Sequence, residues 1–442
     1  MLTIVADSPH NPLLETDVRP LRILLGADTF PPNVNGAANF ASRLAAGLVE
    51  RGHNVQIQAP AFDRHHGAFL EKHDGAEFIV HRVTSWRWFP HDWLRFMLPW
   101  TLQANTSRIV DLVKPDVIHI QSHILVGRGL VKQAKKRGIR IIGTNHFMPE
   151  NMINHTRLPH FLRKMAIGMA WKAAAHTFSQ CEAVTSPSRT AADFLEAETH
   201  LRNVHAISCG IDASLYSQNF EPRTENRIVF VGRVTAEKHI DVLLRALVAI
   251  DPQLDVKLDI VGGGDLMNPL KQMTRDLGIE NRVTFTGYVT DEELRAALDS
   301  ATVFAMPSIA ELQSIATMEA MASALPVVAA NAMALPHLVH DGKNGYLFEP
   351  SNSADLAAKL SAVFQLSEYD LRKMKKASLR YIEEHDIERT LDTFERLYRG
   401  LPVTDPVTES NAIRTAGHQA GHDTFLSTAD VRADSSLDEP LS

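Results

Sequence analysis

Short apolar segments alternate with helical segments along most of the chain, and this alternation occurs twice. The first unit, "LRILLGADTFPPNVNGAANFASRLAAGLVERGHNVQIQAP", predicts a buried strand over 21–25, a helix over 37–50 and a second strand over 54–58. Because a helical crossover makes the two strands that it connects parallel, each unit favours a parallel sheet. "NRIVFVGRVTAEKHIDVLLRALVAI" restarts the pattern in the second half. The sequence therefore predicts an α/β protein with two doubly wound, Rossmann-like domains.

The predicted domain boundary lies in the polar segment "SQNFEPRTENR", residues 217–227. The strongly helical stretch 368–401 ends the second domain, and its last helices could pack back onto the first. After Pro402 the chain is poor in large apolar residues, which predicts disorder. We therefore expect four parts: an N-terminal extension over 1–20, a first domain over 21–216, a second domain over 217–401 and a disordered tail over 402–442.

Composition argues against several classes of protein. The sequence has no run of about 18 apolar residues that would predict a membrane span. Its N-terminus lacks the basic start and apolar block of a signal peptide. The two cysteines, Cys181 and Cys209, offer neither a disulfide framework nor metal-ligand spacing, so we expect both to be small buried residues. These features predict a cytoplasmic protein.

Charge is distributed unevenly. Residues 21–215 carry 22 Lys and Arg against 15 Asp and Glu, whereas the remaining residues carry 23 against 37. A basic first half joined to an acidic second half predicts an anionic partner for the first half, without identifying the anion.

Two glutamates are separated by seven residues in "ELQSIATMEAMASALPVVA". If a helix begins near Gln313, Glu311 lies in the loop before it and Glu319 about two turns along. The start of a helix presents unpaired amides, here those of Gln313, Ser314 and Ile315, beside the positive end of the helix dipole. Such a helix start suits a diphosphate. On its own, the pattern would also fit two solvated glutamates on an amphipathic helix.

Two glycine turns after predicted strands add further phosphate-binding groups. "VFVGRVTAEK" places Gly232 and Arg233 at the end of a strand and Lys238 five residues later. A glycine lets phosphate approach the backbone, while Arg and Lys neutralise its charge. "IVGGGD", residues 260–265, is a second turn of this kind. A lone glycine cluster is weak evidence, but the turns and the paired glutamates in this order indicate a diphosphate site.

These motifs resemble the retaining glycosyltransferases of family 4, which have the two-domain GT-B fold with an inter-domain cleft. The similarity covers roughly residues 22–401, and it includes "PSIAE", "DGKNGYLFEP" and the first-domain pattern "PPNVNG…RGHNV". "ELQS" and "NVNG" are most similar to members that glycosylate diacylglycerol or related lipids.

The resemblance implies a role for each motif. Arg233 and Lys238 would bind the donor diphosphate and stabilise the leaving group, Glu319 would bind the ribose, and Glu311 would face the donor sugar. The backbone of "TGYV", which contains Tyr288, would hold the nucleobase, and the loop over 33–36 would approach the diphosphate from the first domain. The implied catalytic residues are His146, Arg233, Lys238 and Glu311, and the implied donor-binding residues are Gly36, Gly232, Gly263, Tyr288, Gln313, Ser314, Ile315 and Glu319.

Other polar residues of the first domain have less certain assignments. His146, in "GTNHF", would lie beside the reaction centre, whereas His119 and His123 in "DVIHIQSH" fit a core role as well as a site role. Glu150, Asn151 and His155 are candidates for lining the acceptor cleft, and the sequence does not favour that role over a structural one.

The implied reaction transfers a hexose from UDP-glucose or GDP-mannose with retention at the anomeric carbon. Preorganised cations and helix amides aimed at the departing phosphate would be the main catalytic device. The nucleotide sugar is the donor substrate, and we expect no cofactor, no metal and no nucleic-acid partner. The two domains should close on the donor.

Four of the five tryptophans lie in "SWRWFPHDWLRFMLPW", residues 85–100. Tryptophan beside arginine and apolar residues is typical of a surface that lies in a bilayer headgroup region. With the basic segments of the first domain, this stretch predicts a peripheral contact with an anionic membrane on its inner face. The alternative is ordinary packing over the first domain.

Several functions remain open at this level. The leading hypothesis is transfer to a membrane lipid. The alternatives are a soluble family member that makes a polysaccharide or small glycoside, a sugar-nucleotide epimerase on the same fold, and a degenerate binding subunit. The last would be expected to lack Arg233, Lys238 and the two glutamates, all of which are present.

Overall fold

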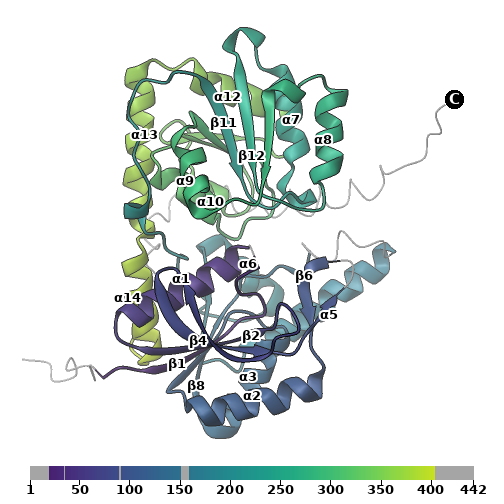
Figure 1. Cartoon of the computed structure of the whole chain (residues 1–442), viewed down its shortest axis with the longest axis vertical. Coiled ribbons are helices and arrows are strands. Elements are labelled where there is room, and N and C mark those ends of the chain that lie inside the picture. The colour runs from purple at the N-terminus through teal and green to yellow at the C-terminus, as the bar shows by residue number, and fades with distance from the viewer. Residues whose placement is uncertain (1–18, 34, 89–90, 151–158, 404–442) are drawn as a thin grey trace, which may run out of the picture.

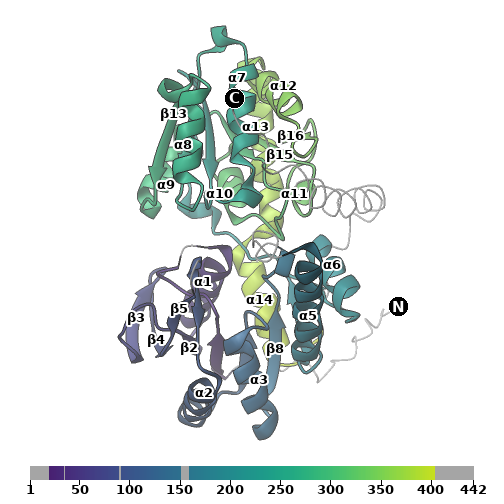
Figure 2. The same ribbon diagram turned by 90° about the vertical axis from the view of Figure 1, so that its right-hand side faces the viewer.

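The computed structural model describes residues 19–33, 35–88, 91–150 and 159–403. The predicted extension and tail therefore lie almost wholly outside the described residues. Within them, two sheet-centred lobes lie one above the other in Figure 1, the lower built mainly from the first half of the chain and the upper from the second. Figure 2 shows the same two layers from the side.

The first lobe is built on an eight-stranded sheet with the order β10-β9-β8-β7-β1-β2-β4-β3. Its strands pair in parallel except at one edge, where β3 runs antiparallel to β4. The strands are β1 (Arg22–Gly26), β2 (Asn54–Pro60), β3 (Gly67–His73), β4 (Ala76–Val83), β7 (Val117–Ile120), β8 (Arg140–Thr144), β9 (Ala183–Ser186) and β10 (His205–Ala206). The helices are α1 (Gly36–Glu50), α2 (Pro99–Val113), α3 (Leu125–Arg137), α5 (His160–Phe178) and α6 (Arg189–Thr199).

The second lobe is built on a six-stranded parallel sheet with the order β13-β12-β11-β14-β15-β16. The strands are β11 (Asn226–Val231), β12 (Val256–Val261), β13 (Val283–Gly287), β14 (Val303–Met306), β15 (Val327–Ala330) and β16 (Gly345–Phe348). The helices are α7 (Ile240–Ala249), α8 (Met267–Asp276), α9 (Asp291–Asp299), α10 (Ile315–Ala322), α11 (Leu335–Leu338), α12 (Ser353–Phe364) and α13 (Glu368–Ile382).

Continuous apolar runs explain why the central strands are parallel and covered by helices. β14 ("VFAM") and β15 ("VVAA") are buried at every position, as expected for strands with helices on both faces. In each sheet the strands that come first in the chain lie to one side of a single point, and the later strands lie to the other side. This switch point lies between β1 and β7 in the first lobe and between β11 and β14 in the second. Doubly wound sheets bind ligands outside the carboxyl ends of their strands at this switch point.

The chain crosses between the lobes twice, in the linker over 207–217 and again over 383–386. The two crossings lie side by side, because Ile211 forms a β-bridge with Asp386. After the second crossing, α14 (Ile387–Tyr398) packs on the first lobe (Figure 1). A Cβ on Gly47 of α1 would lie 2.6 Å from Leu391 Cδ1, so glycine allows this close helix contact.

The tryptophan-rich stretch contains structure that the sequence did not predict. It forms a two-stranded hairpin, β5 (Trp86–Trp88) and β6 (His91–Phe96), before α2 begins at Pro99. Residues 89–90 lie outside the described residues. Among the helices that the structure describes, none is both long enough and apolar enough to cross a membrane.

Candidate active site

A cleft of about 740 Å³ lies between the two lobes, and residues from both line it. Residues just past the strands of both switch points reach it, among them Gln121 after β7 and Gly232 after β11. The twelve residues predicted as catalytic or donor-binding all line this cleft: His146, Arg233, Lys238, Glu311, Gly36, Gly232, Gly263, Tyr288, Gln313, Ser314, Ile315 and Glu319. Segments far apart in the sequence are therefore brought to the edge where doubly wound sheets bind ligands.

Two glycine loops of the second lobe pack against each other where β11 and β12 end. Gly262 has a φ of 131°, and a Cβ on it would lie 2.0 Å from the carbonyl oxygen of Gly232. A Cβ on Gly264 would lie 2.4 Å from the carbonyl oxygen of Val234. Residues with side chains would push the loops apart, so glycine is required for this packing. The exposed backbone that results can approach a phosphate closely.

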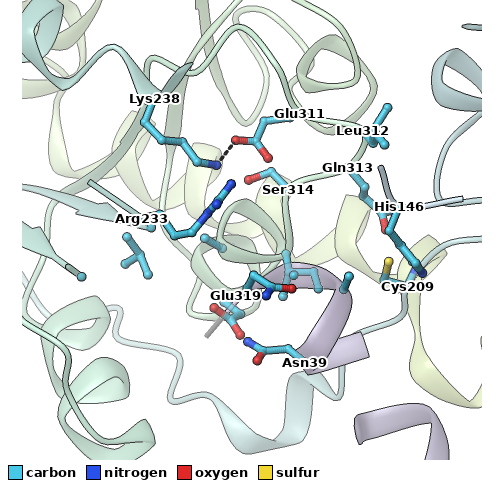
Figure 3. A pocket seen from close by; sticks show the side chains of 18 of the residues that line it. Asn39, His146, Cys209, Arg233, Lys238, Glu311, Leu312, Gln313, Ser314 and Glu319 are labelled. Atoms are coloured by element: carbon cyan, nitrogen blue, oxygen red, sulfur yellow. Dashed lines mark hydrogen bonds and ion pairs between the residues drawn. The ribbon is translucent and has the colours of Figure 1, made fainter. Parts of the chain in front are cut away.

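Two cations follow the first of these loops, and each has an acidic partner. Arg233 Nη2 lies 3.1 Å from Glu237 Oε1, and Lys238 Nζ binds Glu311 Oε1. Figure 3 shows the ends of Arg233 and Lys238 converging beside Glu311. Burial acts to raise the pKa of Glu237, but Arg233, the Thr235 hydroxyl and Lys238 outweigh it and hold that pKa below its usual range. The carboxylates therefore hold both cations in place and balance their charge.

Helix α10 begins beside these cations. Ser314 is its N-cap, and Ser314 Oγ accepts a hydrogen bond of 3.3 Å from the amide of Thr317. The predicted start near Gln313 is thus two residues before the observed first residue, Ile315. A helix start combines unpaired amides with the positive end of the dipole. Because Ser314 lies next to the two cations in Figure 3, the start of α10 and the two cations together make a place that suits an anion.

The side chain of Gln313 points to the linker. Its Oε1 accepts a hydrogen bond of 2.8 Å from the amide of Cys209, and its Nε2 lies 3.0 Å from Ser208 Oγ. Only the backbone of Gln313 is left for the donor-binding role that the sequence predicts.

The ring of Tyr288 covers the second glycine turn. A Cβ on Gly263 would lie 2.6 Å from this ring, so a larger residue could not occupy the position without moving it. Tyr288 is exposed and lies at the end of β13, two strands away from Arg233. This is the part of the cleft where a nucleobase is expected.

Helix α1 of the first lobe begins opposite α10. Its N-cap is Asn35, whose Oδ1 accepts a hydrogen bond of 3.0 Å from the amide of Ala38. A Cβ on Gly36 would lie 3.8 Å from Ile315 Cδ1, so the starts of the two helices meet across the cleft. Two positive helix ends therefore face the same gap. Residue 34 of the predicted 33–36 loop lies outside the described residues.

His146 lies just past β8 on the first-lobe side of the cleft. Its Nε2 lies 3.0 Å from Gln121 Oε1. Because an amide oxygen can only accept, Nε2 carries the proton of the neutral ring. Burial lowers the pKa of His146 to about 4, so the ring is neutral at pH 7. The ring also packs against Phe40 of α1, with 4.9 Å between centroids.

The other two histidine candidates are buried away from the cleft. His119 Nδ1 lies 2.8 Å from the Tyr398 hydroxyl and its Nε2 lies 2.7 Å from Thr144 Oγ1, which ties α14 to the first sheet. His123 packs against Phe178 with 5.7 Å between ring centroids. Neither lines the cleft, which favours the core role left open by the sequence.

The proposed acceptor residues are only partly described. Glu150 accepts a hydrogen bond of 2.7 Å from Trp171 Nε1, is buried, and does not line the cleft. Asn151 and His155 lie outside the described residues.

Known proteins share the sequence pattern behind this site. A family model described as Glycosyltransferase Family 4 matches residues 34–215, and one described as Glycosyl transferases group 1 matches residues 214–380. A GDP-mannose-dependent alpha-mannosyltransferase of Mycolicibacterium smegmatis is 30% identical over 345 residues, which cover 74% of this chain and 84% of the relative. The chain belongs to glycosyltransferase family 4.

One further relative and one solved structure are similar to this family 4 enzyme. It is 25% identical to an alpha-monoglucosyldiacylglycerol synthase of Streptococcus pneumoniae over 74% of this chain and 75% of the relative. Its fold matches a sucrose-phosphate synthase of Thermosynechococcus elongatus with a TM-score of 0.73, at 19% identity, over 86% of this chain and 98% of that one. The predicted GT-B fold is confirmed, and the family 4 enzyme is a hexosyltransferase that uses a nucleotide sugar.

Two cleft residues that sequence reasoning missed form ion pairs with predicted ones, Glu237 with Arg233 and Arg43 with Glu319. Glu237 could have been found, because it stands four residues after Arg233 and next to Lys238. Arg43 could not, because its partner Glu319 lies 276 residues away in the other lobe. Among the described residues, no group of three or more His, Cys, Asp and Glu side chains could hold a metal ion.

Proposed function

We propose that this family 4 enzyme transfers a hexose from UDP-glucose or GDP-mannose to a membrane lipid, with retention at the anomeric carbon. The donor diphosphate would bind between the start of α10 and the glycine loops, with Arg233 and Lys238 on its oxygens and Glu319 on the ribose. The observation that carries this proposal is the convergence of two cations and a helix start on one side of the inter-lobe cleft.

The chemical step follows from this placement. The bond between the sugar C1 and the phosphate oxygen breaks, and the acceptor oxygen bonds to C1 from the same face. The hydroxyl proton leaves with the nucleoside diphosphate. Negative charge grows on the departing phosphate, where Arg233, Lys238 and the amides at Ser314 and Ile315 would stabilise it. His146, a neutral donor at Nε2 to Gln121, would face the sugar from the other lobe.

A donor panel tests the first half of the proposal. The enzyme would be mixed with UDP-glucose, GDP-mannose and their epimers, with and without diacylglycerol vesicles, and release of the nucleoside diphosphate would be followed. We expect release that depends on both donor and acceptor, and an α-linked product by proton NMR. A β-linked product would overturn retention, and epimerised donor in the absence of acceptor would favour the epimerase alternative.

An exposed helix face supports a lipid acceptor. Three large apolar residues of α5, Phe161, Met165 and Met169, are 69%, 55% and 56% exposed and lie one turn apart. Lys164 and Lys172 are exposed on the same helix. A helix that exposes apolar residues with lysines beside them is typical of one lying in a membrane interface. In Figure 1, α5 projects from the first lobe on the same side as the β5–β6 hairpin.

The tryptophan-rich stretch is partly packed on the first lobe and partly exposed. Trp86 and Trp100 are exposed, but Met97 is fully buried. Arg95 donates hydrogen bonds to the carbonyl oxygen of Ala61, at 2.9 Å from Nη2, and so holds the hairpin on the lobe. The side chains of Trp88 and Trp93 lie outside the described residues. The exposed tryptophans would add to the apolar contact of α5.

A vesicle experiment tests the membrane contact. We expect the enzyme to co-sediment with vesicles of phosphatidylglycerol and phosphatidylcholine at low salt, and the triple variant Phe161→Ser, Met165→Ser, Met169→Ser to do so at least about tenfold less. The matched control is Leu112→Ser, Val248→Ser, Tyr369→Ser, which removes exposed apolar residues from other helices. Equal binding by both variants would show that the exposed face of α5 does not make the contact, and no binding by the wild type would favour the soluble alternative.

A further inference from the structure

An ion pair joins the two lobes across the cleft. Arg43 lies on α1 of the first lobe, and its Nη2 is 2.7 Å from Oε1 of Glu319 on α10 of the second. The side chains are 24% and 5% exposed, respectively, and both residues line the cleft. This contact lies about two turns along α1 from Gly36, and about one turn along α10 from Ile315, the two residues that meet at the helix starts. The two helices therefore contact at their starts and again at this pair.

The linker joins the same contact. Tyr216, which ends the first crossing between the lobes, is buried and lines the cleft. Its pKa is raised above the usual range by burial first, and then by the negative charge of Glu319. The phenol is thus neutral beside the ion pair, and Glu319 is the point where both lobes and the linker meet.

The first lobe also holds the loop before α10. Ser188, the N-cap of α6, donates a hydrogen bond of 2.5 Å from Oγ to the carbonyl oxygen of Leu312. This bond fixes the backbone between Glu311 and Gln313. The segment from Glu311 to Glu319, which carries five of the twelve predicted site residues, is therefore positioned partly by the first lobe.

The Arg43–Glu319 pair is mostly buried, so the loss of either member should be costly. Burial acts to lower the pKa of Arg43, but the charge of Glu319 outweighs it and keeps the guanidinium charged. Removing one member of a mostly buried pair leaves the other charge without compensation, which is costly. Among the described residues, Arg43 Nη1 is buried without a hydrogen-bond acceptor, so this end of the guanidinium retains unused donors.

We propose that Arg43 is a positioning residue that makes donor binding depend on the arrangement of the lobes. It orients the carboxylate of Glu319 toward the ribose, and it can do so only when α1 and α10 face each other as they do here. Binding of the nucleotide and formation of the pair then favour each other, because both need the same carboxylate in the same orientation. This inference rests on the proposed function, which assigns Glu319 to the ribose.

A double-mutant cycle tests the inference. The dissociation constants of UDP and GDP would be measured by calorimetry for the wild type, Arg43→Gln, Glu319→Gln and the double variant. We expect Arg43→Gln to weaken binding of the preferred nucleotide roughly tenfold, and the double variant to bind no more than about twofold more weakly than Glu319→Gln. Arg43→Lys, which keeps the charge, should recover part of the loss.

A control variant separates the effect of losing Arg43 from the general effect of losing a paired arginine. Arg137 has a side-chain exposure of 25% and pairs with Asp111 at 2.9 Å on the outer helices of the first lobe. Arg137→Gln should leave nucleotide binding unchanged. Melting temperatures of all variants would identify any that fail to fold, and Arg43→Lys then carries the test.

Small-angle scattering supplies a readout that does not use the ligand. Without nucleotide, Arg43→Gln should have a larger radius of gyration than the wild type or Arg137→Gln, because the cross-lobe contact is lost. Additive effects in the cycle, or nucleotide binding by Arg43→Gln within twofold of the wild type, would overturn the inference alone. A wild type that binds no nucleoside diphosphate would overturn the proposed function, and this inference with it.

Discussion

At the end of β11 the second lobe places Arg233 and, five residues later, Lys238, whereas past β7 and β8 the first lobe places Gln121 and His146. The two sheets follow the same winding rule and present their switch points to the same cleft. Under the proposed function, the second lobe would supply positive charge for a diphosphate, and the first would supply uncharged hydrogen-bonding groups at these two strand ends. The fold therefore places the cleft, while the residues just past each strand set the chemical character of each of its walls.

The net charge of each half of the sequence does not match the charge of its side of the cleft. The first half is basic, yet among its described residues Arg43 is the one Lys or Arg that lines the cleft, together with Asp28 and Asp74. Burial raises the pKa of Asp28, although the Ser122 hydroxyl and the amide of Val126 bind it. The positive charge lies instead on outer helices, as in the last turn of α3 with Lys135, Lys136 and Arg137. Net charge therefore predicts the surface of a lobe better than its site.

The largest expected effect tests the charged side of the cleft. Lys238→Ala should lower kcat by roughly 10²–10³-fold, the scale for losing one transition-state stabiliser, because the departing phosphate loses a cation. The matched control is Lys257→Ala in the same lobe, since Lys257 lies at the opposite end of the sheet and pairs with Glu225 at 3.2 Å. Initial rates with saturating donor provide the measurement. A Lys238→Ala enzyme within threefold of the wild type would show that charge at this position is dispensable.

Much of this arrangement could be predicted from the sequence. Strand ends carry functional residues in parallel sheets, so the local motifs at Gly232, Gly262 and Glu311 were sufficient to predict one side of the cleft. Contacts between distant segments were not predictable, because neither Arg43 nor Glu319 has a local pattern that indicates the other. The β5–β6 hairpin was missed because its aromatic residues do not alternate regularly with polar ones.

The first lobe should lose stability in acid. Burial lowers the pKa of His119 to about 3 and those of His123 and His146 to about 4. The unfolded chain, with histidine pKa values near 6.5, therefore binds more protons than the folded one between about pH 6.5 and 4, and stability falls as the pH falls through this range. At pH 5 each buried histidine should cost roughly 2 kcal/mol relative to pH 7.

Tryptophan fluorescence makes this test specific to the first lobe, since all five tryptophans lie between Trp86 and Trp171. Urea unfolding followed by fluorescence at pH 7 and pH 5 should show the loss of stability, and circular dichroism should report both lobes. His119→Asn should reduce the dependence on pH, even though it removes hydrogen bonds and lowers stability at pH 7. Fluorescence transitions that do not shift between the two pH values would contradict the neutral state assigned to these histidines.

The smallest expected effect concerns α14, which follows the second lobe in sequence but packs on the first. Arg51, just after α1, holds it through three carboxylates: Nη1 lies 2.7 Å from Asp392 and 2.9 Å from Glu395, and Nη2 lies 2.5 Å from Glu388. Two of these partners are largely exposed, and exposed pairs contribute little. Arg51→Ala should therefore lower the free energy of unfolding by only about 1 kcal/mol, with donor turnover unchanged.

Apolar burial, rather than this ion network, should hold α14 in place. Phe394 is fully buried against Phe40, with 5.9 Å between ring centroids, and Leu391 fills the space over Gly47. Leu391→Ala should then cost about 2–5 kcal/mol, several times the cost of Arg51→Ala. The difference between wild type and Arg51→Ala should also shrink at 0.5 M salt, since exposed charges are screened there. If Arg51→Ala proved as costly as Leu391→Ala and its effect did not respond to salt, α14 would be held on the first lobe mainly by charge. The contrast between the paired cations at the strand ends of the second lobe and the neutral groups at those of the first would then not extend to the segment that joins the lobes.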